Sequence, residues 1–429
     1  NFFFGLFLAS FYSTWIFALL VGSINLITYF AVKFILPNSS FYRYVGSGVT
    51  AVFVAQFIYQ MHGLFEMHFF VFVASLILIA YHNWKLQLPL TVIVVIHHGT
   101  FAYLQYTGMK EIYFTQLDYM TLETFIFHGA IATLITFLSG YWSYDFRKKT
   151  NSEIVEQNFE NQKESIEGMN NSLEKLKFSE DELQKIMNSQ KENRKLDFND
   201  KRRLKDFLER QKKQEEILRQ HQEKLKNSFK EKSEDDDFKK ELERRLENSE
   251  KELQENEKLR EELDDYIEKI NEEDLGRKLE EMSKKSDIQK RNMEQLLELT
   301  KRYYVQEKQR KIAEDLDELA RKQEALSEKT GEENSLEEQK RLTQEFQNLE
   351  KEMEELQKEN EKLKAPMEIP ENEELEKEIQ EEQKDAEEEL GKKEKSAAKK
   401  HQKEAAKKMQ EMQKKMEMGM EMQGGEAMM

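Results

Sequence analysis

Six of the eight histidines lie in the first 150 residues of this 429-residue chain, within strongly apolar sequence: His62, His68, His82, His97, His98 and His128. A neutral imidazole is a good ligand for haem iron and for first-row transition metals, and it titrates near neutral pH. Ionisable groups at membrane depth are costly and usually face a bundle interior or a cavity, so these positions are candidate functional residues.

Apolar segments long enough to cross a membrane must position these histidines. A hydrocarbon core of roughly 30 Å needs about 20 apolar residues of helix, and five stretches come within a few residues of that length. The predicted spans are residues 12–36, 44–62, 67–84, 88–106 and 119–144. The sequence therefore predicts a five-helix transmembrane bundle.

Counting inward from the ends of these spans brings five histidines to one level, the outer half of the bundle. They are His62 and His68 between spans two and three, His97 and His98 near the middle of span four, and His128 in span five. We expect Glu66 and Glu123 to serve as their proton partners. His82 falls at the opposite face and is predicted to be an interface residue.

Three interpretations of this histidine cluster stay open. The imidazoles could form hydrogen bonds that hold transmembrane helices together, with the two carboxylates fixing their tautomers. They could ligate a haem or a transition metal, with a carboxylate as ligand or as hydrogen-bond acceptor. They could also sense protons.

The basic residues of this half predict its orientation, because Lys and Arg stay preferentially on the cytoplasmic side. Six fall on one face and only Lys110 on the other; the six are Lys33, Arg43, Lys85, Arg147, Lys148 and Lys149. We expect a multi-pass protein of the inner (cytoplasmic) membrane, with the N-terminus outside and the C-terminal tail in the cytoplasm. Because the chain starts at Asn1 inside apolar sequence, we also expect a segment to precede it.

Charge separates the two halves of the chain. Residues 1–150 carry seven Lys and Arg against five Asp and Glu, which leaves 59 against 78, or a net charge of −19, for the remainder. Such an acidic tail is repelled by nucleic acid, so its expected partners are proteins. The absence of cysteine excludes disulfides, thiolate nucleophiles and Cys-based metal sites.

Four ordered blocks in the apolar half carry a resemblance to a known family. They are residues 61–70 (MHGLFEMHFF), 81–84 (YHNW), the pair His97-His98 and the pair His128-Gly129. Over residues 12–147 the chain resembles the multispanning sensor module of bacterial methyl-accepting chemotaxis proteins and related sensor kinases. It departs from that pattern at Asn83, where Asp is expected, and at Gly129, where Ala is expected. The resemblance implies membrane sensing and leaves the ligand open.

The soluble half is charged helix with a hydrophobic seam. The clearest seam alternates steps of four and three residues, as in the a and d positions of a left-handed coiled coil: Leu342, Phe346, Leu349, Met353, Leu356, Asn360 and Leu363. A second seam runs through Ile312, Leu316, Leu319, Gln323 and Leu326. Asn360 takes an a position, which in a parallel dimer would fix register, so self-association is one predicted partnership.

Breaks in periodicity divide this rod, at Gly276, around Gly331, and at Pro366 and Pro370. The predicted divisions are residues 1–147, 148–275, 276–365 and 366–429, and we expect the rod to fold into hairpins or hinged segments. Residues 228–240 are polar enough to form a loop or a locally disordered segment.

Methionine is concentrated at the end of the chain, with eight of its 18 residues between positions 409 and 429. This pattern predicts an amphipathic helix that frays past Gly424. Helix-in-groove contacts and Cu(I) binding are the alternatives.

A second resemblance covers residues 180–429. Its blocks are residues 296–303, 316–323, 346–349, 363–366 and the Ala/Lys/Met-rich end. They are similar to the C-terminal region of large, uncharacterised bacterial membrane-anchored coiled-coil proteins, a family that implies no activity.

No catalytic motif is visible in the sequence. It contains no phosphate-binding loop, kinase glycine loop, G-x-S-x-G elbow or H-E-x-x-H helix. We therefore predict an all-α, non-enzymatic protein, comprising the transmembrane bundle followed by a long, segmented, cytoplasmic coiled coil. The predicted function is membrane sensing, passed through the fifth span into the tail, and the alternative is a membrane-anchored scaffold with no sensing role.

Overall fold

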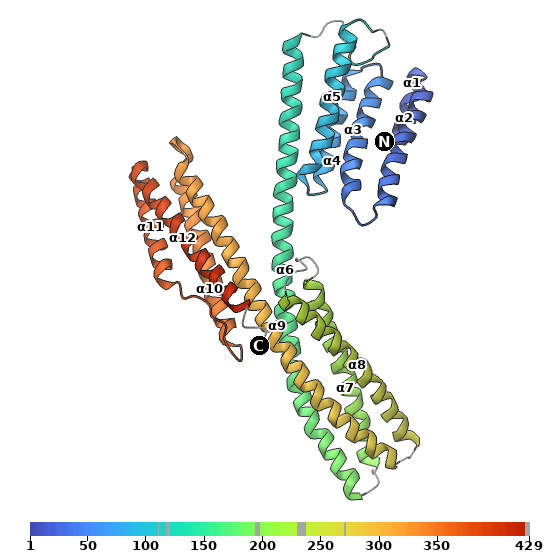
Figure 1. Ribbon diagram of the computed structural model, residues 1–429, viewed down its shortest axis with the longest axis vertical. Coiled ribbons are helices and arrows are strands. Elements are labelled where there is room, and N and C mark those ends of the chain that lie inside the picture. Colours follow the sequence, from blue (N-terminus) through green and yellow to red (C-terminus); the bar gives the residue numbers. More distant parts are fainter. Residues whose placement is uncertain (110, 117–120, 194–197, 230–236, 270–271, 425–429) are drawn as a thin grey trace. The chain divides into compact units, whose positions relative to one another are not determined.

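The computed structural model describes residues 1–109, 111–116, 121–193, 198–229, 237–269 and 272–424 (Figure 1). The chain divides into two compact units, Asn1–Val155 and Glu156–Met429. Over the described residues it contains twelve α-helices, three short 3₁₀ turns and no strand. The all-helical part of the predicted fold is confirmed.

The first unit is built from apolar helices and the start of a 72-residue helix. In chain order they are α1 (Phe2–Tyr12), α2 (Trp15–Ile35), α3 (Phe41–Gln60), the 3₁₀ turn η1 (Phe65–Phe69), α4 (Phe70–Ile79), the 3₁₀ turn η2 (Trp84–Leu86), α5 (Gln87–Tyr106) and α6 (Leu122–Asn193). Residues before Tyr12 form a helix of their own, because Ser13 adopts a left-handed conformation with φ of 55° and ends α1.

Three helices of the described chain are long and apolar enough to cross a membrane. They include the segments Trp15–Ile35, Trp84–Tyr106 and Phe125–Lys191, while Phe2–Tyr12 and Phe65–Ile79 are apolar but shorter. Large apolar side chains on these helices face outward, such as Ile16 at 83% exposure. An outward apolar surface of this kind is suited to lipid.

Buried amides join the helices of the first unit. The Gln60 amide donates to the carbonyl of Gly5 at 2.9 Å and to the hydroxyl of Thr14 at 3.1 Å, and thereby ties α3 to α1. Gln87 donates to the carbonyl of Ser75 at 2.9 Å and accepts from its hydroxyl at 2.9 Å, which ties α5 to α4. Such bonds satisfy polar groups where water is excluded.

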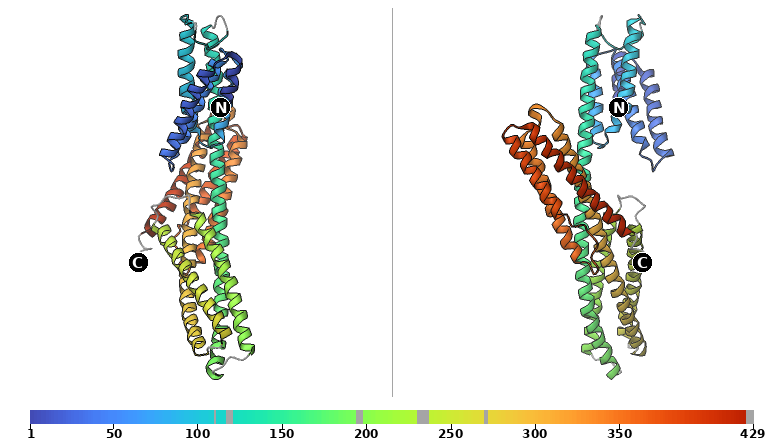
Figure 2. Two further views of the ribbon diagram at one scale, coloured as in Figure 1. Left: turned by 90° about the vertical axis from the view of Figure 1, so that its right-hand side faces the viewer. Right: turned by 60° about the vertical axis from the view of Figure 1, so that its left-hand side comes forward.

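The second unit contains the end of α6 and six further helices. These are α7 (Phe198–Ser228), α8 (Asp237–Lys269), α9 (Glu272–Glu328), α10 (Leu336–Glu361), α11 (Glu373–Gly391) and α12 (Lys395–Gly424). Two bundles share α9 (Figure 2). Its first half packs with α6, α7 and α8, and its second half packs with α10, α11 and α12.

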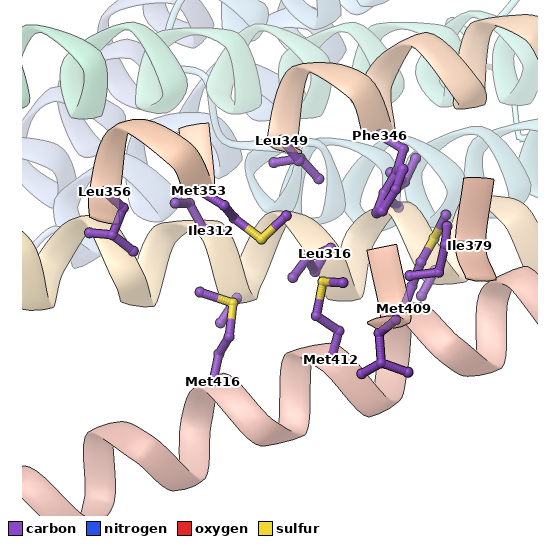
Figure 3. Packing of buried hydrophobic residues seen from close by; sticks show 14 of the residues in the cluster. Ile312, Leu316, Phe346, Leu349, Met353, Leu356, Ile379, Met409, Met412 and Met416 are labelled. Carbon is purple, nitrogen blue, oxygen red and sulfur yellow. The ribbon is translucent and has the colours of Figure 1, made fainter. Parts of the chain in front are cut away.

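Both predicted seams are buried in the C-terminal bundle. All seven positions of the 342–363 seam and all five of the 312–326 seam are at most 7% exposed. Figure 3 shows Leu316 on α9 beside Met412, in the same core as Phe346 and Leu349 on α10. The amphipathic pattern of the methionine-rich end is confirmed over Met409, Met412 and Met416, which complete this core from α12. The helix runs to Gly424, beyond the exposed Met418.

The predicted breaks are borne out in part. The turn around Gly331 separates α9 from α10, and the segment containing Pro366 and Pro370 separates α10 from α11. Near the break predicted at Gly276, α8 ends at Lys269 and α9 begins at Glu272, so the helix boundary lies a few residues before this glycine. Most of the predicted loop at 228–240 lies outside the described residues.

Asn360 makes both of its hydrogen bonds within the chain. Its side-chain oxygen accepts from the backbone N–H of Met367, and its amide donates to the carbonyl of Met367, each at 2.8 Å. The residue therefore fixes the connection that leaves α10. Its register role in a parallel dimer stays a prediction.

Helices α6 and α7 approach closely at Gly168. A Cβ added at this position would overlap the ring of His221, whose Nδ1 is buried and has no hydrogen-bond partner. The structure therefore packs the ring of His221 on α7 against α6.

We expect Gly168→Ala to lower the free energy of unfolding by about 1–3 kcal/mol, because the methyl group overpacks this contact. Denaturation of the full chain in detergent, followed by circular dichroism, measures the effect. Gly391→Ala is the matched control, since its Cβ meets no atom within 4 Å. A Gly168→Ala, His221→Ala double variant should recover part of the loss, and a lack of coupling would contradict the packing.

Candidate functional site

Four of the predicted histidines come together in the first unit: His68 from η1, His97 and His98 from α5, and His128 from α6. The ring centroid of His98 lies 5.3 Å from that of His68, 5.3 Å from that of His97 and 5.8 Å from that of His128. The rings of His68 and His128 are 5.8 Å apart. These four residues are called the histidine cluster below.

Backbone geometry assigns the tautomer of the two histidines on α5. The Nδ1 atom of His98 lies 3.0 Å from the carbonyl oxygen of Val94, which can only accept, so this nitrogen carries the proton. The Nδ1 atom of His97 lies 3.3 Å from the same nitrogen and then serves as an acceptor. His98 is thereby left with a basic Nε2, and His97 with an N–H at Nε2 that has no partner.

His68 is the most deeply buried member of the cluster, at 5% exposure. Its Nδ1 atom has no hydrogen-bond partner. A buried polar atom without a partner costs free energy. The site therefore has hydrogen-bonding capacity that the protein itself does not use.

Three predicted members lie outside the cluster. His62 stacks between the rings of Tyr12 and Tyr113, at centroid distances of 4.1 and 4.0 Å. Glu66 and Glu123 are exposed, and neither bonds an imidazole among the described residues. The carboxylates thus do not fix the tautomers in this conformation, and the backbone of Val94 does so instead.

Phe114 closes the cluster on one side, a role that the sequence analysis missed. Its buried ring lies 5.2 Å from the rings of both His68 and His98. The side-chain oxygen of Gln105 accepts from the backbone N–H groups of Phe114 and Thr115 at 2.8 and 3.0 Å. The segment then packs on Gly63, which has φ of +74°, and a Cβ there would lie 2.6 Å from the nitrogen of Thr115.

A cavity of about 210 Å³ opens beside the cluster, between α4, α5 and α6. His68, His98 and His128 supply its imidazoles, and Thr133 and Thr136 supply hydroxyls on the wall from α6. Most other lining side chains are apolar, such as those of Val71, Phe72 and Leu90. This arrangement is chemically suited to a small, mostly apolar molecule that exchanges hydrogen bonds with imidazole.

This geometry gives no support to the haem hypothesis or to the metal hypothesis. Among the residues that the structure describes, no group of three or more His, Cys, Asp or Glu is arranged to hold a metal ion. The cavity, at about 210 Å³, is also smaller than the ~300–1,000 Å³ typical of sites for drug-sized ligands. Both hypotheses stay predictions.

Comparisons with protein-family models, with curated proteins and with solved structures find no match to this chain. The resemblance to chemotaxis sensor modules therefore stays an expectation, and the site is interpreted from its own geometry.

We expect Gly63→Ala to displace the segment that carries Phe114, because the added methyl group would overlap the backbone of that segment. Alanine at a positive φ also carries a backbone strain of about 1–3 kcal/mol, which favours the displacement. Diethyl pyrocarbonate should then modify His68 and His98 severalfold faster, as measured by mass spectrometry of the full chain in detergent. Gly99→Ala, on α5 beside His98, is the control, since no atom lies within 4 Å of its Cβ. Equal modification in both variants would show that Phe114 does not close the site.

Proposed function

We propose that this chain is a non-enzymatic membrane sensor, in which the histidine cavity receives the stimulus and α6 passes the change to the helices of the second unit. The stimulus is a small ligand or a proton, since the unpartnered Nδ1 atom belongs to His68, which lines the cavity. The resemblance of residues 12–147 to chemotaxis sensor modules supports the same class of function.

The observation that carries this proposal is the continuity of α6. One helix runs from Leu122 to Asn193 without interruption. Near its start it supplies His128, Thr133 and Thr136 to the cavity, and near its end it supplies side chains to the cores of the second unit, namely Met169, Leu173, Leu176, Leu183 and Ile186.

The proposed physical route is a small shift or rotation of this helix. Packed helices move between discrete arrangements and do not deform continuously, so a change at one end is felt along the element. A ligand that fills the cavity would bias α6 only if it binds one arrangement more tightly than the other.

We further propose that the first unit is multi-pass in the inner membrane, with its basic face in the cytoplasm. Six of its seven Lys and Arg fall on that face by sequence. The three long apolar helices support membrane insertion.

Because the chain has no cysteine, single-cysteine variants test this topology cleanly. Asn38 and Thr107 are exposed residues of the first unit, between α2 and α3 and at the end of α5 respectively. In intact cells we expect an impermeant maleimide to label Thr107→Cys and to label Asn38→Cys only after permeabilisation. The opposite pattern would reverse the orientation, and labelling of both in intact cells would contradict membrane insertion.

Coupling through α6 can be tested without knowing the ligand. We expect Gly129→Phe, which places a ring at the cavity wall, to change hydrogen-exchange protection of residues 156–193 in the full chain. Gly99→Phe is the matched control, because both glycines are helical with no neighbour within 4 Å of their Cβ atoms but only Gly129 borders the cavity.

A change in the Gly129→Phe variant alone supports sensing. If protection of residues 156–193 is the same in both variants and in the parent chain, the cavity is not coupled to the tail. The membrane-anchored scaffold would then be the better interpretation.

A further inference from the structure

A second cavity, of about 550 Å³, lies in the C-terminal bundle of the second unit. It is bounded by the last turns of α10, the connection from α10 to α11, the first turns of α11, and Met416 of α12. It is called the acidic groove below. Nothing in the sensing proposal uses it.

The walls of the acidic groove are carboxylates and its floor is apolar. Seven glutamates line it: Glu350, Glu354, Glu361, Glu368, Glu371, Glu373 and Glu376. Its lining residues, all described by the structure, include no lysine or arginine. Met353, Leu356 and Met416 form a buried apolar surface beneath these charges.

Asn372 gives an independent indication of a ligand. This residue precedes α11 as its N-cap and is 7% exposed. Its side-chain oxygen makes no capping bond and has no hydrogen-bond partner, whereas Ser335, the N-cap of α10, accepts from the N–H of Glu338 at 3.2 Å. A buried acceptor thus borders the groove without a donor.

The groove is also preorganised by hydrogen bonds within the chain. Asn360 binds both backbone polar groups of Met367, as described above. Arg302 of α9 donates to the carbonyl of Ala365 at 2.9 Å, and the N–H of Lys364 donates to Glu298 at 2.9 Å. The connection is therefore held to α9 and α10, so its ordering does not oppose binding.

Two of these carboxylates have lysine partners outside the groove, Glu354 with Lys358 at 2.8 Å and Glu373 with Lys377 at 3.8 Å. Burial raises the pKa of Glu376 and the charges of Glu350 and Glu373 raise it further, against a smaller lowering by Lys377. Burial also raises the pKa of Glu350, against a hydrogen bond from Gln380 that lowers it. Glu376 makes no ion pair among the described residues. Glu350, Glu373 and Glu376 form a negatively charged cluster that a cation would stabilise.

We propose that the acidic groove binds a linear polyamine. Ammonium groups would pair with Glu350, Glu373 and Glu376 and donate to Asn372, while the methylene chains between them would lie on Met353 and Met416. The volume falls within the range of small-molecule sites. A compact metal cation is a poorer match, since no metal-binding group is found among the described residues.

Spermidine titrated into the full chain in detergent, followed by calorimetry, tests this proposal. We expect saturable 1:1 binding that weakens at least ~10-fold, or 1.4 kcal/mol, in Glu376→Gln and in Asn372→Ala. Glu388→Gln is the matched control, because this glutamate is also on α11, pairs with Lys392 and does not line the groove. Circular dichroism of each variant checks that the bundle still folds.

The pH dependence of binding supplies a second readout. An ammonium group needs an ionised carboxylate, and the pKa of Glu376 lies above its ordinary value. Affinity should therefore rise as pH increases from 5 to 7, and this rise should be smaller in Glu376→Gln.

Three outcomes would overturn the proposal. Equal weakening in Glu376→Gln and Glu388→Gln would show diffuse attraction to a polyanion. Tighter binding of Mg²⁺ than of spermidine would indicate a metal site. Binding of a lysine-rich peptide in the absence of spermidine binding would indicate a protein-docking surface.

Discussion

The constraint on which the second unit depends is that its apolar seams have only one another to pack against. The sequence after residue 150 carries a net charge of −19, and its apolar residues form stripes rather than a continuous core. A stripe leaves water only when another stripe covers it. The chain achieves this by folding back on itself, so that α9 contributes Leu297 to one core and Leu316 to another.

Buried amides decide which helices pair. Gln323 and Gln339 exchange hydrogen bonds at 2.7 and 3.2 Å, and Gln383 and Gln402 join them from α11 and α12. All four residues are fully buried. Sliding any helix by one turn would separate donors from acceptors, which is costly in an apolar interior. These four glutamines therefore specify the register of the helices, whereas leucine packing alone would tolerate other registers.

Local features of the fold were predictable from sequence, and contacts between distant residues were not. The 342–363 seam was predictable because steps of three and four residues place side chains on one face of a helix and of no other regular structure. The seam of α9 and the methionine pattern of α12 were predicted in the same way, but spacing alone does not say which seam packs on which, so self-association and intramolecular hairpins both stayed open. The same limit applies to the site: counting along spans brought His68 to the level of His98, but it also included His62, which stacks with tyrosines instead. The contact of Gly63 with the segment of Phe114 joins residues about 50 positions apart and leaves no periodic trace.

The sharing of α9 has a thermodynamic consequence. One bundle cannot melt completely while the other stays intact unless this 57-residue helix is cut in two by a helix–coil boundary. Such a boundary exposes unpaired backbone groups and forfeits the cooperativity of an unbroken helix. Unfolding of either bundle is therefore coupled to unfolding of the other through the main-chain hydrogen bonds of α9. The two bundles are expected to unfold together rather than one at a time.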